Sequence, residues 1–210
     1  MQKIKPKLKI TYATHAAARY ACENWHYSKC IPKSKLVKYG VYEDDSFKGC
    51  IVYGCGATSS LVSRYGLKQE QGCELVRVAL RDHFWPVSKM LAITLKMLKK
   101  DFSNLKLVVS FADPEQGHHG GIYQATNWIH DGRSQASDEY IYKGRRWQGR
   151  SFRNSYKGME NHPDVKKVKG SSKIRYLMPL NKDLEKIIKS KAREYPKRIE
   201  HESNAHENHS

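Results

Sequence analysis

The feature that most constrains the fold is one helical pattern lying between two apolar strand patterns. The segment "VSKMLAITLKMLKKDF" (87–102) carries apolar residues at helical spacing and has a lysine-rich end that suits the helix dipole. "GCELVRVAL" (72–80) precedes it and "LKLVVSFAD" (105–113) follows it, and both are typical of buried strands. This order predicts a mixed α/β domain, not a bundle or a repeat.

The rest of the chain adds elements on both sides of this unit. Thr14 is expected to cap the first helix and Asn181 the last one, because both side chains accept hydrogen bonds from helix N-termini. The expected elements are a strand at "LKITYAT" (8–14), a helix from His15, a hairpin over 35–57 through "DDS", a short helix near "GIYQATNW" (121–128), a strand and turn at "IHDG" (129–132), a strand at "KIRYLMPL" (173–180) and a helix from Lys182.

Charge points to a polyanionic partner. The 38 lysines and arginines exceed the 21 acidic residues and give a formal net charge of +17. Like charges in such excess repel one another in the folded protein, and a polyanion relieves this repulsion. Nucleic acid is therefore the expected partner, and the alternative is a basic protein whose charge only keeps it soluble. We expect one domain over residues 1–196 and a disordered tail over 197–210, which is polar and has nothing to bury.

The segment "IYKGRRWQGRSFRNSYKGM" (141–159) concentrates this charge, with six basic residues, four aromatic residues and no acid. It is predicted to be a basic aromatic insertion that holds nucleic acid. The alternative is a solvated surface loop whose aromatic side chains are buried. Its candidate binding residues are Arg145, Arg146, Trp147, Arg150 and Arg153.

Cysteine usage and hydropathy exclude several classes. The five cysteines are odd in number and show no C-x-x-C spacing, which argues against a disulfide framework and a zinc ribbon. The sequence shows no signal peptide and no apolar run of membrane length. A soluble protein of a reducing cytoplasm, with no membrane partner, is the expectation.

The span "SFADPEQGHHGGIYQATNW" (110–128) is the first candidate site. Asp113 follows a predicted strand end, where α/β folds tend to place ligands, and Ser110 precedes it by three residues. Asp113 is therefore a candidate to bind or deprotonate a substrate, with Ser110 lining the same pocket. A turn aspartate before Pro114 is the structural alternative.

Further candidates lie in "WHYSK" and beyond. His26, beside Tyr27, is a candidate general base or metal ligand, since an unperturbed histidine titrates near neutral pH. His118 is a second metal candidate, but the sequence has no H-x-x-x-H pair, so its spacing does not support iron or zinc. Lys29 and Lys35 are candidates to hold phosphate. Arg77, isolated among apolar residues, requires a carboxylate or phosphate partner or an extended side chain that reaches solvent.

The stretch "IYQATNWIHDG" resembles the last segment of GNAT-type acyltransferases, in which a helical tyrosine precedes a Gly-Phe pair that opens the next strand. Here Tyr123 is the tyrosine, and Asn127 and Trp128 replace the pair. The resemblance implies a GNAT-like mixed central sheet flanked by helices, with Tyr123 protonating the leaving group of an acyl donor. However, "RDHFWPVSKM" lacks the glycine-rich loop that holds a cofactor pyrophosphate in that family, and Pro86 removes an N–H donor.

Four separated segments together resemble the phage Mom family of DNA-modification proteins: "NWHYSKCIPKSKLVKYGVYED", "CELVRVALRDHFWPVSKML", "VVSFADPEQGHHGGIYQATNW" and "KIRYLMPL". The resemblance implies an enzyme that converts adenine in double-stranded DNA to N6-carbamoylmethyladenine and so protects phage DNA from restriction. It further implies base flipping, Asp113 near adenine N6, and action in the cytoplasm of the infected bacterial host.

The implied product, N6-carbamoylmethyladenine, restricts the identity of the group donor. Its added group contains a nitrogen atom, which a plain acetyl group cannot supply. A glycyl donor such as glycyl-tRNA has the right atoms, and tRNA is then a second partner; an acyl-CoA is the alternative. Three rival functions stay open. They are an adenine N6-methyltransferase, suggested by "ADPE", a non-catalytic DNA-binding protection protein, and a GNAT enzyme that acetylates a small molecule or protein.

Overall fold

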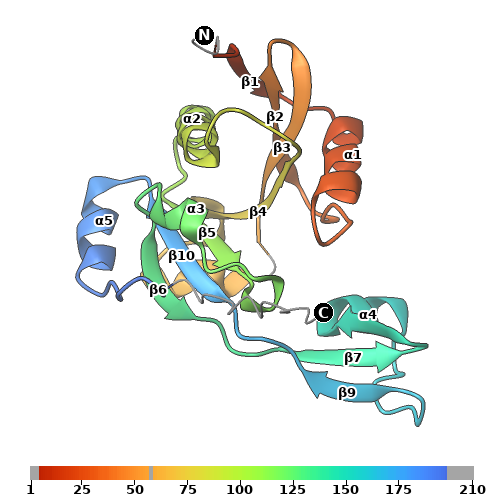
Figure 1. Ribbon diagram of the computed structural model, residues 1–210. Coiled ribbons are helices and arrows are strands. Elements are labelled where there is room, and N and C mark those ends of the chain that lie inside the picture. The colour runs from red at the N-terminus through yellow and green to blue at the C-terminus, as the bar shows by residue number, and fades with distance from the viewer. Residues whose placement is uncertain (1–4, 57–58, 198–210) are drawn as a thin grey trace, which may run out of the picture.

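The computed structural model describes residues 5–56 and 59–197, and its largest feature is a seven-stranded sheet (Figure 1). The strand order is β1-β2-β3-β4-β5-β10-β6, and only β4 and β5 are parallel neighbours in it. The strands are β1 (Leu8–Tyr12), β2 (Leu36–Glu43), β3 (Ser46–Gly54), β4 (Gly72–Leu80), β5 (Leu107–Ala112), β10 (Ile174–Pro179) and β6 (Ile129–Arg133). The predicted mixed central sheet flanked by helices is confirmed.

Two helices cover opposite faces of β2, β3 and β4: α1 (His15–Trp25) and α2 (Val87–Asp101) (Figure 1). Strand β3 supplies both cores, because successive side chains of a strand point to opposite faces. Val52 packs in the cluster that contains the buried alanines of α1. Ile51 packs in the cluster that contains the leucines of α2.

Both predicted helix caps are present. Thr14 Oγ1 accepts the N–H of Ala17 at 3.1 Å, and Asn181 Oδ1 accepts the N–H of Leu184 at 2.8 Å, where α5 (Lys182–Lys189) begins. No helix in the described part of the chain is long and apolar enough to cross a membrane.

The helix predicted near 121–128 is shorter than expected. It is the single turn α3 (Gly121–Gln124), and the chain then bends into β6. Asn127 stands at the bend with a φ of 59°, in the left-handed region that glycine adopts at no cost and that asparagine tolerates. This explains how Asn127 can stand where the GNAT pattern has glycine. Trp128 follows it and is fully buried.

The parallel pairing of β4 with β5 is short and positions the site. It joins Gly72–Glu74 to Leu107–Val109, although β4 continues to Leu80 and β5 to Ala112. On its other side, β4 stays paired with β3 as far as Leu80, with a bulge at Val76. Beyond the paired residues the two strands diverge, and the space between them is the cavity described below.

Residues 138–169 form a separate three-stranded sheet with one helix, which we call the basic module (Figure 1). Its elements are β7 (Asp138–Tyr142), β8 (Arg145–Gln148), α4 (Gly149–Ser155) and β9 (Lys166–Lys169). The module follows β6 and precedes β10, so it is inserted between two strands of the main sheet. Two linking segments, 134–137 and 170–173, form a neck in which Gly170 donates its N–H to the Ser137 carbonyl at 2.8 Å.

Aromatic side chains form the core of the basic module. The Tyr140 and Phe152 rings are stacked with centroids 4.6 Å apart, and Tyr142 and Tyr156 pack around Phe152. Phe152 is fully buried, so the aromatic residues of the segment hold the module together and its basic residues face solvent. The predicted tail, 197–210, lies outside the described residues except for Lys197.

Candidate functional site

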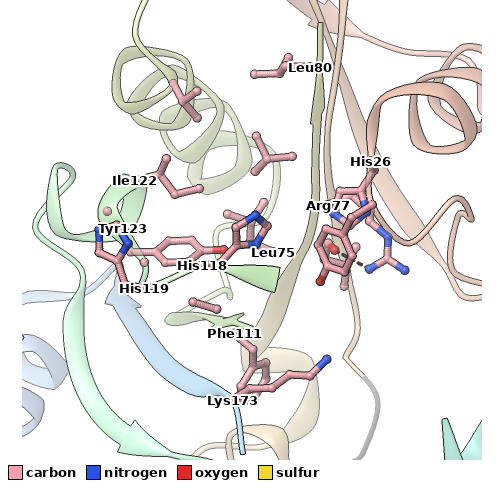
Figure 2. Close-up of a pocket in the computed structure, with 18 of the residues that line it drawn as sticks. His26, Leu75, Arg77, Leu80, Phe111, His118, His119, Ile122, Tyr123 and Lys173 are labelled. Atoms are coloured by element: carbon pink, nitrogen blue, oxygen red, sulfur yellow. Dashed lines mark hydrogen bonds between the residues drawn. The ribbon is translucent and has the colours of Figure 1, made fainter. Parts of the chain in front are cut away.

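The site is a cavity of about 700 Å³ between the diverging parts of β4 and β5 (Figure 2). Figure 2 shows Tyr123 and His118 on the α3 side, and His26 and Arg77 on the opposite side beside β4. The cavity therefore brings together residues from four distant segments of the chain. Its lining is mixed: apolar side chains of β4 and α3 alternate with histidines, Arg77 and Lys173.

Tyr123 forms the inner wall of the cavity. Its hydroxyl lies 2.8 Å from Ser110 Oγ, which is also 2.9 Å from the Leu75 carbonyl, and the single Ser110 proton serves one of these two contacts at a time. Burial raises the pKa of Tyr123 to about 12, although the hydrogen bond from Ser110 acts in the opposite direction. Tyr123 is consequently protonated at neutral pH, and Ser110 of β5 contacts its hydroxyl. The sequence placed Ser110 in one pocket with Asp113, whereas the structure places it against Tyr123 and outside the cavity lining.

His26 and Tyr27 form the opposite wall, directly after α1. Their rings are 4.3 Å apart, and the Tyr27 ring meets His118 edge to face at 5.4 Å. Tyr27 is about half exposed, so part of its aromatic ring is accessible from solvent. Burial, followed by the positive charges of Arg77, His118 and Lys29, lowers the pKa of His26 to about 4.

Arg77 holds the loop after α1 against β4. Its Nε donates to the Cys30 carbonyl at 3.2 Å and one terminal nitrogen donates to the Val76 carbonyl at 2.7 Å. The sequence left open a carboxylate or phosphate partner or a side chain extended to solvent, and the structure gives Arg77 backbone carbonyls. The guanidinium keeps its full positive charge beside the cavity, since carbonyls do not neutralise it.

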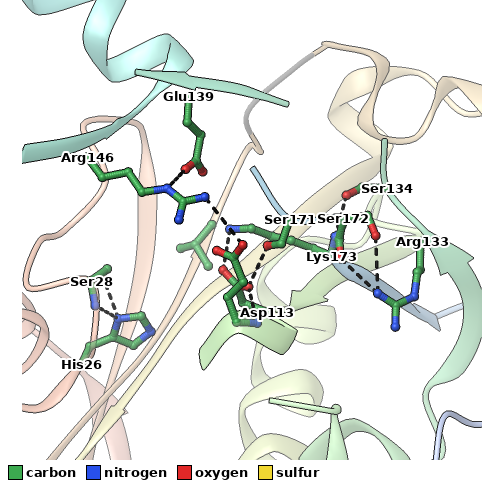
Figure 3. Close-up of polar contacts among 12 residues, drawn as sticks. His26, Ser28, Asp113, Arg133, Ser134, Glu139, Arg146, Ser171, Ser172 and Lys173 are labelled. Atoms are coloured by element: carbon green, nitrogen blue, oxygen red, sulfur yellow. Dashed lines mark hydrogen bonds and ion pairs between the residues drawn. The ribbon is translucent and has the colours of Figure 1, made fainter. Parts of the chain in front are cut away.

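Asp113 is not among the residues that line the cavity; it lies against Ser171 and Lys173 (Figure 3). It accepts hydrogen bonds from the Glu115 N–H at 3.2 Å and from Ser171 Oγ at 3.1 Å. Its other oxygen is 3.3 Å from Lys173 Nζ, and Lys173 does line the cavity. Asp113 thus caps the short turn after β5 and holds a lysine at the edge of the site.

The basic module and its neck contact the turn after β5, which contains Asp113 and Glu115, at the edge of the cavity. Arg146 forms ion pairs with Glu139 of β7 and with Glu115 of the turn that Asp113 caps (Figure 3). Ser171, which bonds Asp113, belongs to the neck. The remaining predicted cations, Arg145, Arg150 and Arg153, form no ion pair with any carboxylate in the described part of the chain. Trp147 packs against Tyr156 and under the Arg145 guanidinium.

Two predicted lysines lie away from the cavity lining. Lys29 donates to the Asn24 carbonyl at 3.0 Å and acts on the site only through its charge. Lys35 lines a second cavity of about 530 Å³ near the end of α2. The polar lining residues that the sequence did not single out are Lys173, Glu74 and His83.

The loop before α2, which the sequence resemblance to GNAT enzymes equates with their pyrophosphate loop, binds a side chain of the protein itself. Glu43 is 5% exposed, and its carboxyl oxygens accept the N–H groups of Phe84 at 2.9 Å and Trp85 at 2.9 Å. Two donors that could face an anion at the start of a helix are therefore used within the protein. Pro86, the next residue, has no N–H to offer.

His26 and His118 are the two candidate metal ligands predicted from the sequence, and both line the cavity. Within the described ranges, no group of three or more His, Cys, Asp or Glu side chains is arranged to hold a metal ion. The five cysteines are free.

Comparisons with known proteins agree with the family resemblance in the sequence. The model of the Mom protein family matches residues 7–197. No curated protein matches significantly. Similar solved structures include an N-acyl amino acid synthase from uncultured soil microbes, which is 12% identical in sequence. The match covers 83% of this chain and 91% of the synthase chain, with a TM-score of 0.49. A spermidine/spermine N-acetyltransferase from Vibrio cholerae is similar at 11% identity, with coverages of 86% and 96% and a TM-score of 0.45.

Proposed function

The chain belongs to the Mom protein family, and from this premise we propose that it is a transferase that converts adenine N6 in double-stranded DNA to N6-carbamoylmethyladenine. The modification protects phage DNA from restriction in the cytoplasm of the infected host. The observation that carries the proposal is the cavity beside the basic module, whose Arg146 and Ser171 contact the turn at its edge.

We assign the binding of the DNA backbone to the basic module. Phosphate contacts from arginine and lysine give most of the affinity for DNA and fix its orientation. Arg145, Arg150 and Arg153 are exposed, and no carboxylate of the described residues neutralises them. A duplex lying across these residues has its backbone near the neck, beside the entrance of the cavity.

The cavity has the size and lining for a flipped base. Its volume of about 700 Å³ falls within the range of small-molecule sites, roughly 300 to 1,000 Å³. An extruded adenine requires aromatic contact and polar groups at its edge. Tyr27 and His118 offer aromatic surfaces, and Tyr123 and Lys173 offer polar groups.

The donor we propose is an oxygen ester of glycine, such as glycyl-tRNA. Glu43 occupies two N–H groups of the loop that would hold a CoA pyrophosphate. Burial raises the pKa of Tyr123, and a weak acid of this kind is well matched to the basic alkoxide that leaves from a ribose ester.

The chemistry balances without an oxidant or reductant. Adenine N6 attacks the glycyl carbonyl, a C–N bond forms, and the ribose oxygen leaves with a proton while N6 loses one. The free glycyl amine then attacks adenine C6 through a five-membered ring. Expulsion of the original N6 as a carboxamide leaves –CH2–CO–NH2 on the new exocyclic nitrogen. The product has gained the atoms of one glycine residue.

Mass spectrometry of nucleosides tests the function. Plasmid DNA is purified with protease treatment after expression of the wild type or Asp113→Ala. We expect deoxyadenosine to gain the mass of one glycine residue in the wild type, and the gain to fall strongly in the variant, because Lys173 loses its partner. A gain of one methylene mass would indicate a methyltransferase. Protected DNA without any adduct would indicate a binding protein.

The module's role in binding is tested by Arg145→Gln with Arg150→Gln. We expect weaker binding to all duplex sequences, and a salt dependence shallower by about 2 in the log–log slope, since each lost phosphate contact removes about 0.9. Fluorescence anisotropy at several salt concentrations measures both. Lys182→Gln with Lys186→Gln on α5 removes the same charge elsewhere, and an equal effect of that control would refute a local role for the module.

A further inference from the structure

The hydrogen bonds of His26 fix which ring nitrogen carries the proton. Its Nδ1 accepts the backbone N–H of Ser28 at 3.1 Å and lies 2.8 Å from Ser28 Oγ (Figure 3). A backbone N–H can only donate, so Nδ1 carries no hydrogen. In a neutral imidazole the proton is then on Nε2. The ring, which lines the cavity, therefore has an N–H to offer and no free lone pair.

Burial and nearby positive groups keep the His26 ring neutral. Arg77 on β4, His118 on the loop before α3 and Lys29 on the loop after α1 all disfavour a charged imidazole. With burial they lower its pKa to about 4, so the imidazole is uncharged at neutral pH. The positive potential that opposes a second cation also favours an anion that forms nearby.

We propose that His26 is a neutral hydrogen-bond donor that stabilises the oxyanion formed when adenine N6 attacks the acyl carbonyl. This rests on the proposed function. In that step the C–N bond forms and the carbonyl π electrons move to oxygen; the tetrahedral anion then collapses and expels the ribose oxygen, which takes a proton. His26 Nε2–H donates to the anionic oxygen and transfers no proton itself.

This role is opposite to the general base expected from the sequence. A base would require a free lone pair at Nε2, and the contact with Ser28 leaves that nitrogen protonated. A neutral donor in a positive, partly buried site also needs no rearrangement as the negative charge develops, which is the property that makes such donors effective.

Three substitutions separate donating from accepting. His26→Gln keeps an N–H group near the position of Nε2 but has no basic nitrogen. His26→Glu has a basic oxygen and no donor at neutral pH, and His26→Leu has neither. We expect His26→Gln to stay within about tenfold of the wild-type turnover, and His26→Leu and His26→Glu to fall about 10²–10³-fold, the usual cost of losing one such donor. Steady-state rates of adduct formation on a duplex measure this, and thermal unfolding checks that each variant is folded.

Nitrogen-15 NMR of labelled histidine in the wild-type protein tests the tautomer directly, with the His26 signal identified by its loss in His26→Gln. A protonated Nε2 supports the proposal. A protonated Nδ1, or an active His26→Glu beside an inactive His26→Gln, would overturn it while the proposed function stands. A wild type that forms no adduct from any glycyl ester overturns the proposed function, and the oxyanion role falls with it.

Discussion

Tyr123→Phe is expected to lower the rate of adenine modification by about 10²–10⁴-fold, the usual contribution of a general acid. The substitution removes one hydroxyl from a buried ring that packs between Trp128 and Tyr176. The ring contacts stay, so the fold is retained. The lost group is the proton source for the leaving oxygen, and Ser110 cannot replace it because its hydroxyl is bonded to the Leu75 carbonyl. Single-turnover rates with a glycyl ester measure the effect.

The matched control is Tyr53→Phe. Tyr53 is also buried, its hydroxyl lies 2.8 Å from Thr94 Oγ1 of α2, and it does not line the cavity. We expect this variant to lose a similar amount of stability and to keep its activity. If Tyr123→Phe retained the wild-type rate with an ester donor, the proton would have to come from another group and the assignment would be wrong.

Glu43→Ala is expected to lower the free energy of unfolding by about 2–4 kcal/mol, because it leaves the N–H groups of Phe84 and Trp85 without their carboxylate partner. Urea unfolding measures this loss. The same substitution frees the loop that the sequence resemblance to GNAT enzymes equates with their pyrophosphate site. We therefore expect Glu43→Ala, unlike the wild type, to bind inorganic pyrophosphate in calorimetry, since loop N–H groups at a helix start favour an anion.

Glu43→Gln is the control for shape. Its amide oxygen can still accept a hydrogen bond, so it should lose less stability than Glu43→Ala and gain little affinity for pyrophosphate. Wild-type protein that binds pyrophosphate or coenzyme A as tightly as Glu43→Ala would show that the carboxylate does not block the loop. The argument against a CoA donor would then fail.

Periodicity and capping residues predicted most of the main sheet. The helix over 87–101, the two capped helix starts and the hairpin at Asp44 all occur where the sequence placed them. These features depend on contacts between residues close in the chain, so local patterns determine them.

The site was harder to predict, because it depends on long-range geometry. The bulge at Val76 breaks the alternation of β4, so Leu75 faces the α2 core while Arg77 turns toward the loop after α1. Strict alternation would place these two side chains on one face. A single sequence carries no signal for that extra residue.

Lys173 and Glu43 were missed for a related reason. Lys173 follows "GSS" and is unremarkable in sequence, yet the neck places it against Asp113 at the cavity edge. Glu43 ends a strand and looks like a turn residue, but it is separated by 41 positions from the N–H it binds at Phe84. Asp113 was predicted to contact the substrate, and this contact stays a prediction. The partners of Asp113 in the structure show in addition that it holds Lys173 in place.

The central claim is that a glycyl group is transferred to adenine N6 and then rearranges. The most direct measurement is mass spectrometry of the modified nucleoside formed from duplex DNA and glycyl-tRNA carrying nitrogen-15 in its amino group. We predict that the adduct contains one label, and that hydrolysis of its terminal amide releases unlabelled ammonia and leaves the label on the nitrogen attached to the purine. Labelled ammonia, or an adduct formed only from an acyl-CoA, would contradict the account.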